Sequence, residues 1–252
     1  VAGISTVQQI CSSSAQVALI DLLGGAPATS GYWTFGNDPH SQFFDPAIDG
    51  SGAYVYTVVG LAPCPNRVAQ VQVTKVLAPD AGSNGTIAAC VGDAMIQLAS
   101  GLGGAPNAGG TWTDVDGTGQ LSSGVLNATS LAPGTYHFAY TVAGSGPCAA
   151  ANATVTVLIS EALYAGDDTS ATVCKNQLVD LFTLLGGTPQ VGGAWTDLDG
   201  SGALIAGVFN GAALAANSTW HFRYAIPTTS SCQGDTAIVT ILLEDGPFAG
   251  CD

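Results

Sequence analysis

Basic side chains are nearly absent from this chain. Its 252 residues include 4 Lys and Arg against 18 Asp and Glu, which gives a formal net charge of −14 at pH 7. A surface this acidic repels phosphate backbones and anionic lipid headgroups, so we expect no nucleic-acid partner. The sequence also has no apolar run of membrane-spanning length and no secretion signal at Val1. We therefore expect no membrane insertion, and we expect that any signal was removed or lies upstream.

Motifs that carry catalysis are missing as well. The sequence has no Gly-x-Ser-x-Gly elbow, no phosphate-cradling Gly-x-x-x-x-Gly-Lys and no His-Glu-x-x-His. Its seven cysteines come without a Cys-x-x-Cys pair or clustered histidines, which argues against a metal site built on them. The sequence predicts a protein that is not an enzyme and that needs no cofactor.

What the chain does contain is one pattern repeated three times. The segment 109–117 returns as 192–200, and a divergent copy surrounds Trp33. An Ala-Gly pair, a Leu-Gly-Gly, a Trp and a Tyr recur in this order with a period of about 80 residues. They begin at Ala2, Ala81 and Ala165, Leu23, Leu102 and Leu185, Trp33, Trp112 and Trp195, and Tyr56, Tyr140 and Tyr224.

These landmarks predict three repeats, at 1–79, 80–163 and 164–247. A fourth Ala-Gly at Ala249 predicts that 248–252 begins a further repeat. We expect the sequence to be a window cut from a longer repetitive chain. A genuine end that keeps a vestige of the pattern is the alternative.

The composition favours strands over helices. There are 34 Gly and 12 Pro, and apolar residues alternate with Thr, as in 154–157 and 236–241. This period of two is typical of β-strands. A repeat of about 80 residues is just large enough to bury its own core. We therefore predict an all-β array of three small domains. In the second repeat we expect six strands, near residues 86–88, 95–99, 111–115, 125–129, 136–142 and 153–159.

Six of the seven cysteines recur in phase, one early and one late in each repeat. The early ones are Cys11, Cys90 and Cys174, and the late ones are Cys64, Cys148 and Cys232. Six cysteines permit 15 pairings in principle. Six antiparallel strands place the first and last hairpins at the same end of a sandwich, so we predict one structural disulfide within each repeat. Seven strands would place them at opposite ends.

Disulfides imply an oxidising, extracellular site. Cys251 breaks the phase of the other cysteines. We predict that it cross-links to a neighbouring chain or pairs within a repeat outside this window.

The end of the second repeat indicates the type of sandwich. Residues 131–136 read Leu-Ala-Pro-Gly-Thr-Tyr and lead into an alternating strand. Immunoglobulin-like and fibronectin-like sandwiches use such a turn to cross between their sheets. The predicted fold is therefore a tandem array of Ig-like or fibronectin-like antiparallel β-sandwiches.

The sequence also resembles a known family. The phrases LGGAPNAGGTWTDVDGTG and LGGTPQVGGAWTDLDGSG, followed by APGTYHFAYTVAGSGPC, are similar to tandem repeats of large Bacteroidota surface proteins exported by the type IX secretion system. Gliding adhesins and extracellular fibres are of this kind. The resemblance covers the whole chain, but the first repeat lacks the paired aspartates. It implies an extracellular, non-catalytic stalk or adhesive role and identifies no ligand.

The Asp-x-Asp-Gly motif is the best candidate for chemistry. Asp114 with Asp116, and Asp197 with Asp199, offer oxygen ligands at the spacing of short calcium loops. Neither copy has the distal Glu of a complete site, and Asp-Gly is also a frequent turn, which we favour. We hold calcium as a weaker alternative. Asp235-Thr236-Ala237 resembles a Bacteroidota O-glycosylation site, which makes Thr236 a candidate glycan acceptor.

Two functions from different classes remain open. In the first, disulfide-closed modules form a stalk, fibre or filament, with adjacent repeats and other copies of the chain as partners. In the second, the modules bind cell-surface polysaccharide or another cell through exposed aromatic side chains. We expect the repeated tryptophans to lie in the sandwich core. Tyr32 and Trp220 lack a matching aromatic in some repeats, so they are the better surface candidates.

Overall fold

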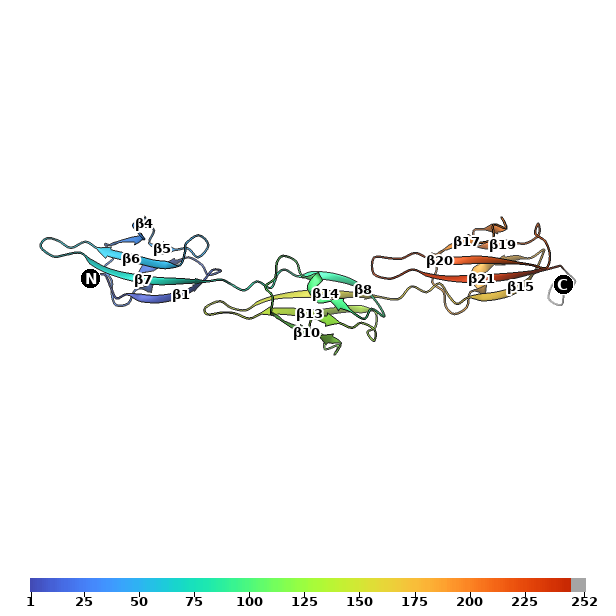
Figure 1. The fold of residues 1–252 in the computed structure, drawn as a ribbon, viewed down its shortest axis with the longest axis horizontal. Coiled ribbons are helices and arrows are strands. Elements are labelled where there is room, and N and C mark those ends of the chain that lie inside the picture. The colour runs from blue at the N-terminus through green and yellow to red at the C-terminus, as the bar shows by residue number, and fades with distance from the viewer. Residues whose placement is uncertain (246–252) are drawn as a thin grey trace. The chain divides into compact units, whose positions relative to one another are not determined.

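The computed structural model describes residues 1–245 and consists almost entirely of strands (Figure 1). Within that range the helices are three single turns of 3₁₀ type, which are η1 (Leu19–Leu22), η2 (Leu98–Gly101) and η3 (Leu181–Leu184). The predicted all-β fold class is confirmed. The strands and their sheets recur at the period of the sequence repeats, and they are described below under the repeat in which they fall.

The first repeat contains two sheets. The larger has the order β1-β7-β6-β3-β4, and the smaller pairs β2 with β5. Their strands are β1 (Thr6–Cys11), β2 (Val17–Ala18), β3 (Tyr32–Phe35), β4 (Asp38–His40), β5 (Phe43–Phe44), β6 (Gly52–Val58) and β7 (Arg67–Val76).

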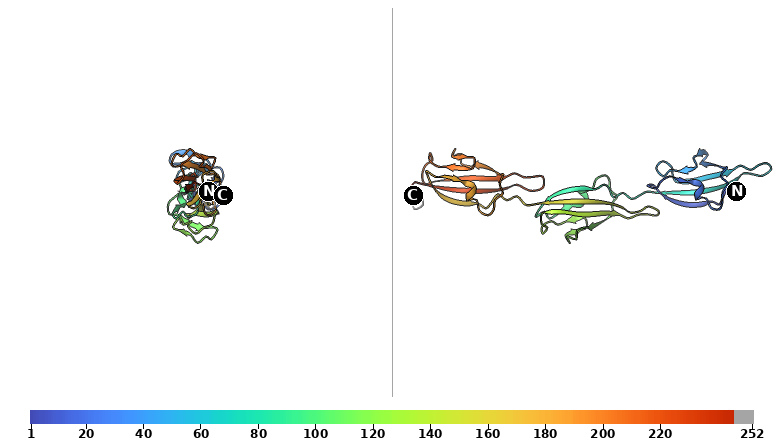
Figure 2. Two further views of the ribbon diagram at one scale, coloured as in Figure 1. Left: turned by 90° about the vertical axis from the view of Figure 1, so that its right-hand side faces the viewer. Right: turned by 180° about the vertical axis from the view of Figure 1, so that it is seen from behind.

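The second and third repeats each contain a four-stranded and a three-stranded sheet. The second has β10-β13-β14-β8 and β11-β12-β9, and the third has β15-β21-β20-β17 and β16-β19-β18. The same sheets can be followed from behind in Figure 2. The second repeat has β8 (Gly85–Cys90), β9 (Ile96–Gln97), β10 (Thr111–Asp114), β11 (Leu121–Ser122), β12 (Val125–Leu126), β13 (Gly134–Val142) and β14 (Ala151–Ser160). The third has β15 (Thr169–Cys174), β16 (Leu178–Asp180), β17 (Ala194–Asp197), β18 (Leu204–Ile205), β19 (Val208–Asn210), β20 (Ser218–Ile226) and β21 (Asp235–Glu244).

The topology is immunoglobulin-like. In the second and third repeats one sheet holds the second, fifth and fourth strands in that order, and the other holds the third, sixth, seventh and first. This division corresponds to the two sheets of an immunoglobulin sandwich. The first strand runs parallel to the last: β1 pairs with β7 and β15 with β21 in parallel register. The remaining pairs described in the large sheets are antiparallel.

The predicted number of strands was wrong. The second repeat has seven, because the stretch expected as one strand near 125–129 follows a separate strand, β11, across a two-residue turn. Ser123 and Gly124 have φ values of 49° and 80° in that turn. Two positive φ values at adjacent turn residues fit the tightest class of β-hairpin. The extra strand reverses the parity on which the disulfide prediction rested.

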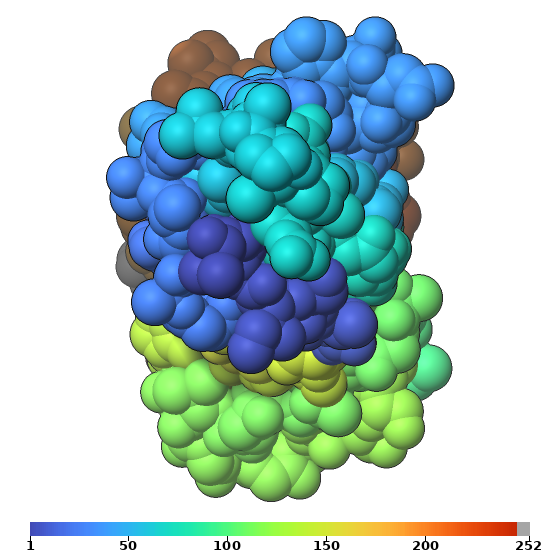
Figure 3. Space-filling view, turned by 90° about the vertical axis from the view of Figure 1, so that its left-hand side faces the viewer, coloured from blue at the N-terminus to red at the C-terminus, as the bar shows by residue number. Residues whose placement is uncertain are grey.

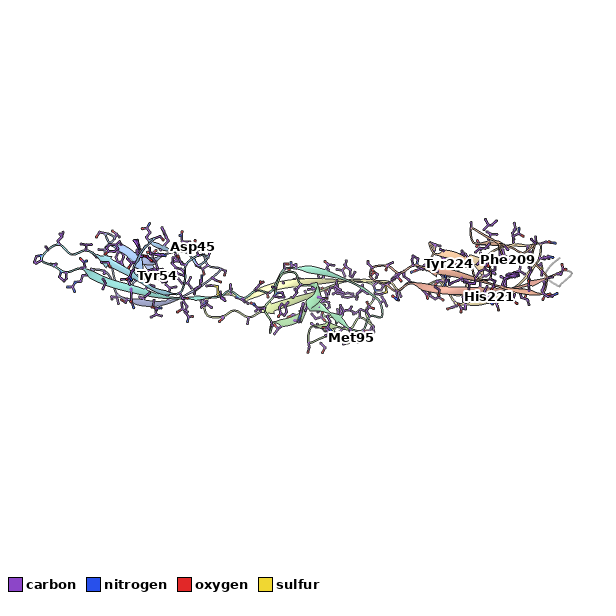
Figure 4. The ribbon with its side chains drawn as sticks, turned by 45° about the horizontal axis from the view of Figure 1, so that its top comes forward. Asp45, Tyr54, Met95, Phe209, His221 and Tyr224 are labelled. Atoms are coloured by element: carbon purple, nitrogen blue, oxygen red, sulfur yellow. A yellow bond between two sulfur atoms is a disulfide. The ribbon has the colours of Figure 1, made fainter. Side chains whose placement is uncertain are left out.

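A tyrosine staple holds the core of every repeat. The ring of Tyr224 lies 5.1 Å from that of Trp195, and its hydroxyl donates to the Gln190 carbonyl at 2.9 Å and accepts from the Gly193 amide at 2.8 Å. Figure 4 labels Tyr224 in the third repeat. A Cβ on Gly193 would lie 2.6 Å from Cζ of this ring, so the second glycine of the Gly-Gly-x-Trp motif permits the close approach. Tyr56 and Tyr140 make the equivalent ring contacts and hydrogen bonds.

The other repeated landmarks also meet each other. The residue after each Ala-Gly pair forms a β-bridge to the Leu-Gly-Gly segment, as between Ser83 and Gly103. Gly82 has a φ of 78°, a conformation that L side chains rarely adopt. The alanines of the pairs are buried, with Ala81 2% exposed. The short motifs that recur in the sequence are thus the places where the chain comes too close for larger side chains.

The described chain also separates into two compact units by proximity of its backbone. One unit comprises Val1–Gly85, Ala99–Val115 and His137–Val155, and the other comprises the rest of the described residues. This division cuts through the second repeat. The boundaries predicted for the three repeats therefore stay a prediction, and the start of a further repeat at 248–252 lies outside the described residues.

Candidate functional site: disulfides that join consecutive repeats

The disulfides link neighbouring repeats, so the pairing predicted within each repeat was wrong. Cys11 is bonded to Cys148 with a Cα–Cα distance of 5.1 Å, and Cys90 to Cys232 with a Cα–Cα distance of 5.0 Å. In each bond, the early cysteine of one repeat joins the late cysteine of the next. Cys64 has a free, exposed thiol.

The last two cysteines complete this account. Cys174 is also disulfide-bonded. The prediction of a cross-link through Cys251 falls on a residue outside the described range. The expectation of structural disulfides thus holds for five of the six in-phase cysteines, and it fails for Cys64.

The parallel pairing of the first and last strands explains why the predicted bonds cannot form. Cys11 ends β1 and stands opposite Val76, at the end of β7. Cys64 precedes the start of β7 at Arg67. At about 3.3 Å per residue, the length of β7 separates the two thiols by roughly 30 Å. The early and late cysteines of a repeat therefore lie at opposite ends of the same sheet.

The first disulfide is packed against the last strand of the first repeat. Sγ of Cys148 lies 3.4 Å from the carbonyl oxygen of Val76, and the Ser12 amide donates to that carbonyl at 2.8 Å. Cys11 is 3% exposed and Cys148 6%. The bond therefore replaces solvent at the edge where β1 and β7 end.

The second disulfide has the same setting. Sγ of Cys232 lies 3.1 Å from the carbonyl oxygen of Glu161, just past the end of β14, and Oγ of Ser231 lies 3.3 Å from Oγ of Ser160. Cys90 is 8% exposed and Cys232 3%. One geometry thus occurs twice, with different neighbouring side chains.

The paired aspartates of the third repeat are engaged within their own loop. The Asp197 carboxylate accepts hydrogen bonds from Oγ of Ser201 at 2.7 Å, the Gly202 amide at 3.0 Å and the Asp199 amide at 3.2 Å. Desolvation raises the pKa of Asp197, but these hydrogen bonds outweigh it and hold the pKa below its usual value. Oδ2 of Asp199 accepts from the backbone amide of His221 at 2.7 Å and lies 2.9 Å from Nδ1 of that residue.

These contacts bear on the calcium alternative. Gly117 and Gly200, which close the two Asp-x-Asp-Gly motifs, have φ values of 69° and 68°, as expected for turns. Asp114 ends β10, while Asp116 lies in the turn beyond it. Across residues 1–245, no three His, Cys, Asp or Glu side chains gather in a way that could hold a metal ion. Calcium binding at the four aspartates stays an untested alternative.

The repeated tryptophans do not form an exposed aromatic surface. Trp33 is 4% exposed, and Trp112 and Trp195 are partly buried against their tyrosines. Trp220 packs against the core of the third repeat, and its indole N–H donates to Oγ of Ser218 at 2.7 Å. Of the aromatic side chains proposed for ligand binding, Tyr32 is the exposed one, at 52%. Thr236 is exposed on β21, where a glycan would meet no steric barrier from the core.

Comparison with known proteins places the fold among tandem immunoglobulin domains. No protein-family model and no curated protein matches the chain. Among solved structures it is similar to the I67–I69 fragment of titin, with 10% identity, a TM-score of 0.41 and 96% of each chain covered. A mutated variant of the same three titin domains gives 12% identity and a TM-score of 0.40, again with 96% of each chain covered. Immunoglobulin domains 1–5 of Sidekick-1 give 12% identity and a TM-score of 0.31, with 96% of this chain and 58% of that chain covered.

The fold class is therefore that of tandem Ig-like domains. Similarities of this size leave function open. The search for membrane-spanning segments adds one finding, which is that residues 1–245 hold no helix long and apolar enough to cross a bilayer.

Proposed function

We propose that this chain is a non-catalytic structural repeat region of an extracellular surface appendage, which is a stalk, fibre or filament supporting adhesion or contact between cell surfaces. The observation that carries the proposal is the covalent bond between consecutive repeats. Segment 77–84, between β7 and β8, would otherwise be the only covalent connection between the first two sandwiches. The Cys11–Cys148 disulfide provides a second one. A region selected to transmit load benefits from such a bond at every junction.

Three features support an extracellular location. Disulfides persist in oxidising compartments and are rare in the cytosol. A net charge of −14 keeps acidic repeats soluble and apart from anionic surfaces. The resemblance to repeats exported by the type IX secretion system of Bacteroidota leads to the same place. Adjacent repeats of the same chain are the partners that the disulfides involve, and other copies are the partners that a filament would add.

An adhesive module that grips carbohydrate is the alternative. Its aromatic contact would depend on Tyr32, because the repeated tryptophans pack against the tyrosine staples. A glycan array probed with the chain and with Tyr32→Ala separates the two functions. Binding that Tyr32→Ala abolishes would favour the adhesive module, whereas silence against all sugars would leave the structural role.

Electron microscopy of the native material tests the proposal. We expect ordered linear arrays of sandwiches in an extracellular fibre, with electron density continuous between repeats at the disulfides. Isolated chains that are free in solution and join no larger structure would overturn the assignment to an appendage.

A further inference from the structure

Cys64 occupies the loop that carries the inter-repeat cysteine in the other two repeats. It lies between the last two strands of its repeat, β6 and β7. Cys148 has the same place between β13 and β14, and Cys232 between β20 and β21. Both of these are bonded to the first-strand cysteine of the preceding repeat, whereas Cys64 has a free thiol. Two of the three equivalent loops therefore show what this position does when a partner is present.

The loop around Cys64 already has the conformation of a bonded loop. The Cys64 amide donates to the Leu61 carbonyl at 2.8 Å, and the Cys148 amide donates to the carbonyl of Ser145, also three residues earlier, at 3.0 Å. A Cβ on Gly60 would clash with the carbonyl oxygen of Cys64, just as one on Gly144 would clash with that of Cys148. The thiol is thus held in a turn of the same shape before any bond is made, which lowers the ordering cost of forming one.

The surroundings of Cys64 differ in being uncovered. Cys148 and Cys232 are 6% and 3% exposed, since each lies against a carbonyl at the end of the preceding repeat's last strand. Leu61 and Val59 beside Cys64 are 87% and 61% exposed. Figure 3 shows the loop in cyan on the face toward the viewer. The thiol and its apolar neighbours are what the other loops bury on docking.

We propose that Cys64 is a covalent attachment site that forms a disulfide with the first-strand cysteine of another repeat of this type. The partner is defined by its chemistry: a strand that ends in an apolar residue and Cys, as Ile10-Cys11 and Ala89-Cys90 do, beside the end of a parallel last strand with an available carbonyl. The site goes beyond the proposed function and does not depend on it.

Formation of the bond is a balanced oxidation. The two thiols lose two protons and two electrons as the S–S bond forms, and a low-molecular-weight disulfide accepts the electrons and is reduced to two thiols. Exchange passes through a mixed disulfide that the second thiolate resolves. The proposal requires no metal or other cofactor.

A tandem chain tests the inference. Residues 1–247 are fused directly to residues 1–252, so that Ala2-Gly3 of the second copy stands where Ala249-Gly250 follows the third repeat. Cys174 of the first copy then precedes Cys64 of the second by 137 residues, the separation found between Cys11 and Cys148. The protein is refolded in a mixture of reduced and oxidised glutathione, its free thiols are alkylated, and its disulfides are mapped by mass spectrometry without reduction.

We expect a peptide that joins Cys174 of the first copy to Cys64 of the second. The matched control carries Cys174→Ser in the first copy, and there Cys64 of the second copy should be alkylated. In both proteins the Cys11–Cys148 and Cys90–Cys232 peptides report that the repeats have folded. The proposal is wrong if Cys64 of the second copy is alkylated in the parent protein, carries glutathione, or joins another Cys64. Failure of the internal disulfides would refute the pairing rule on which it rests.

Discussion

The two disulfides overlap along the sequence, and this predicts how far the chain can be stretched. Cys90 lies between Cys11 and Cys148, and Cys148 lies between Cys90 and Cys232. Two covalent routes therefore run from Cys11 to Cys232. One follows the backbone for the 79 residues from 11 to 90 and then crosses a disulfide; the other crosses a disulfide first and follows the 84 residues from 148 to 232. The backbone alone covers 221 residues, the difference between 11 and 232.

The magnitudes follow from the reach of an extended chain. At about 3.5 Å per residue, the shorter route limits the distance between Cys11 and Cys232 to about 280 Å, against about 770 Å for the backbone alone. Removing either disulfide leaves one short route, so the limit changes by at most five residues, or about 18 Å. Removing both adds about 500 Å. The effect of the two bonds on maximum extension is thus strongly non-additive.

Single-molecule force spectroscopy can measure this directly. Four proteins are pulled from their ends to full unfolding: the parent chain, Cys11→Ser/Cys148→Ser, Cys90→Ser/Cys232→Ser, and the quadruple variant. We expect the first three to reach nearly the same contour length and the fourth to be longer by about 500 Å. The disulfide at Cys174 is common to all four and cancels in the comparison. If loss of a single bond lengthens the chain by hundreds of ångströms, the pairing or its overlap is wrong.

Three further predictions concern the repeats themselves. Tyr140→Phe leaves the Asn107 carbonyl and the Gly110 amide without their partner, so we expect a loss of about 1–3 kcal/mol in the second repeat, measured by hydrogen exchange of its strands. Gly110→Ala places a Cβ against the ring of Tyr140, and we expect a similar loss of about 1–3 kcal/mol by the same measurement; unchanged protection would refute the close approach. Burial, and then the charge of Asp49, raise the pKa of Tyr54 to about 12, so the folded chain keeps a proton that the unfolded chain releases above pH 10. The first repeat should therefore lose up to roughly 1.4 kcal/mol per pH unit between pH 10 and 12 in urea titrations, and Tyr54→Phe should remove this slope.

Much of the fold could be predicted from local signals. Alternating Thr and apolar residues define the long strands, and Gly and Pro mark their ends, so the all-β class and the sandwich followed from the sequence. The short strands were harder, because β11 and β12 have two residues each and carry no period that can be counted. The turn between them did have a signal, a glycine after a small polar residue at Ser123-Gly124, which is a known hairpin dipeptide.

The disulfide pairing could not be predicted from the phase of the cysteines. A pattern in which every repeat has an early and a late cysteine is equally regular whether a late cysteine bonds within its repeat or to the one before. Only the position of Cys11 at the far end of β1 from the loop of Cys64 decides between these, and that position depends on the number of strands. One missed two-residue strand was enough to reverse the conclusion.

The overlapping bonds also have a consequence for survival among extracellular proteases. A cut between Cys11 and Cys90 leaves the N-terminal piece attached through Cys148, and a cut between Cys148 and Cys232 leaves the C-terminal piece attached through Cys90. A cut in the shared stretch between Cys90 and Cys148 is bridged by both bonds. Any single cleavage from Cys11 to Cys232 therefore fails to sever the chain. Loop tips are where proteases nick most folded domains, and this protein would remain one molecule after such damage.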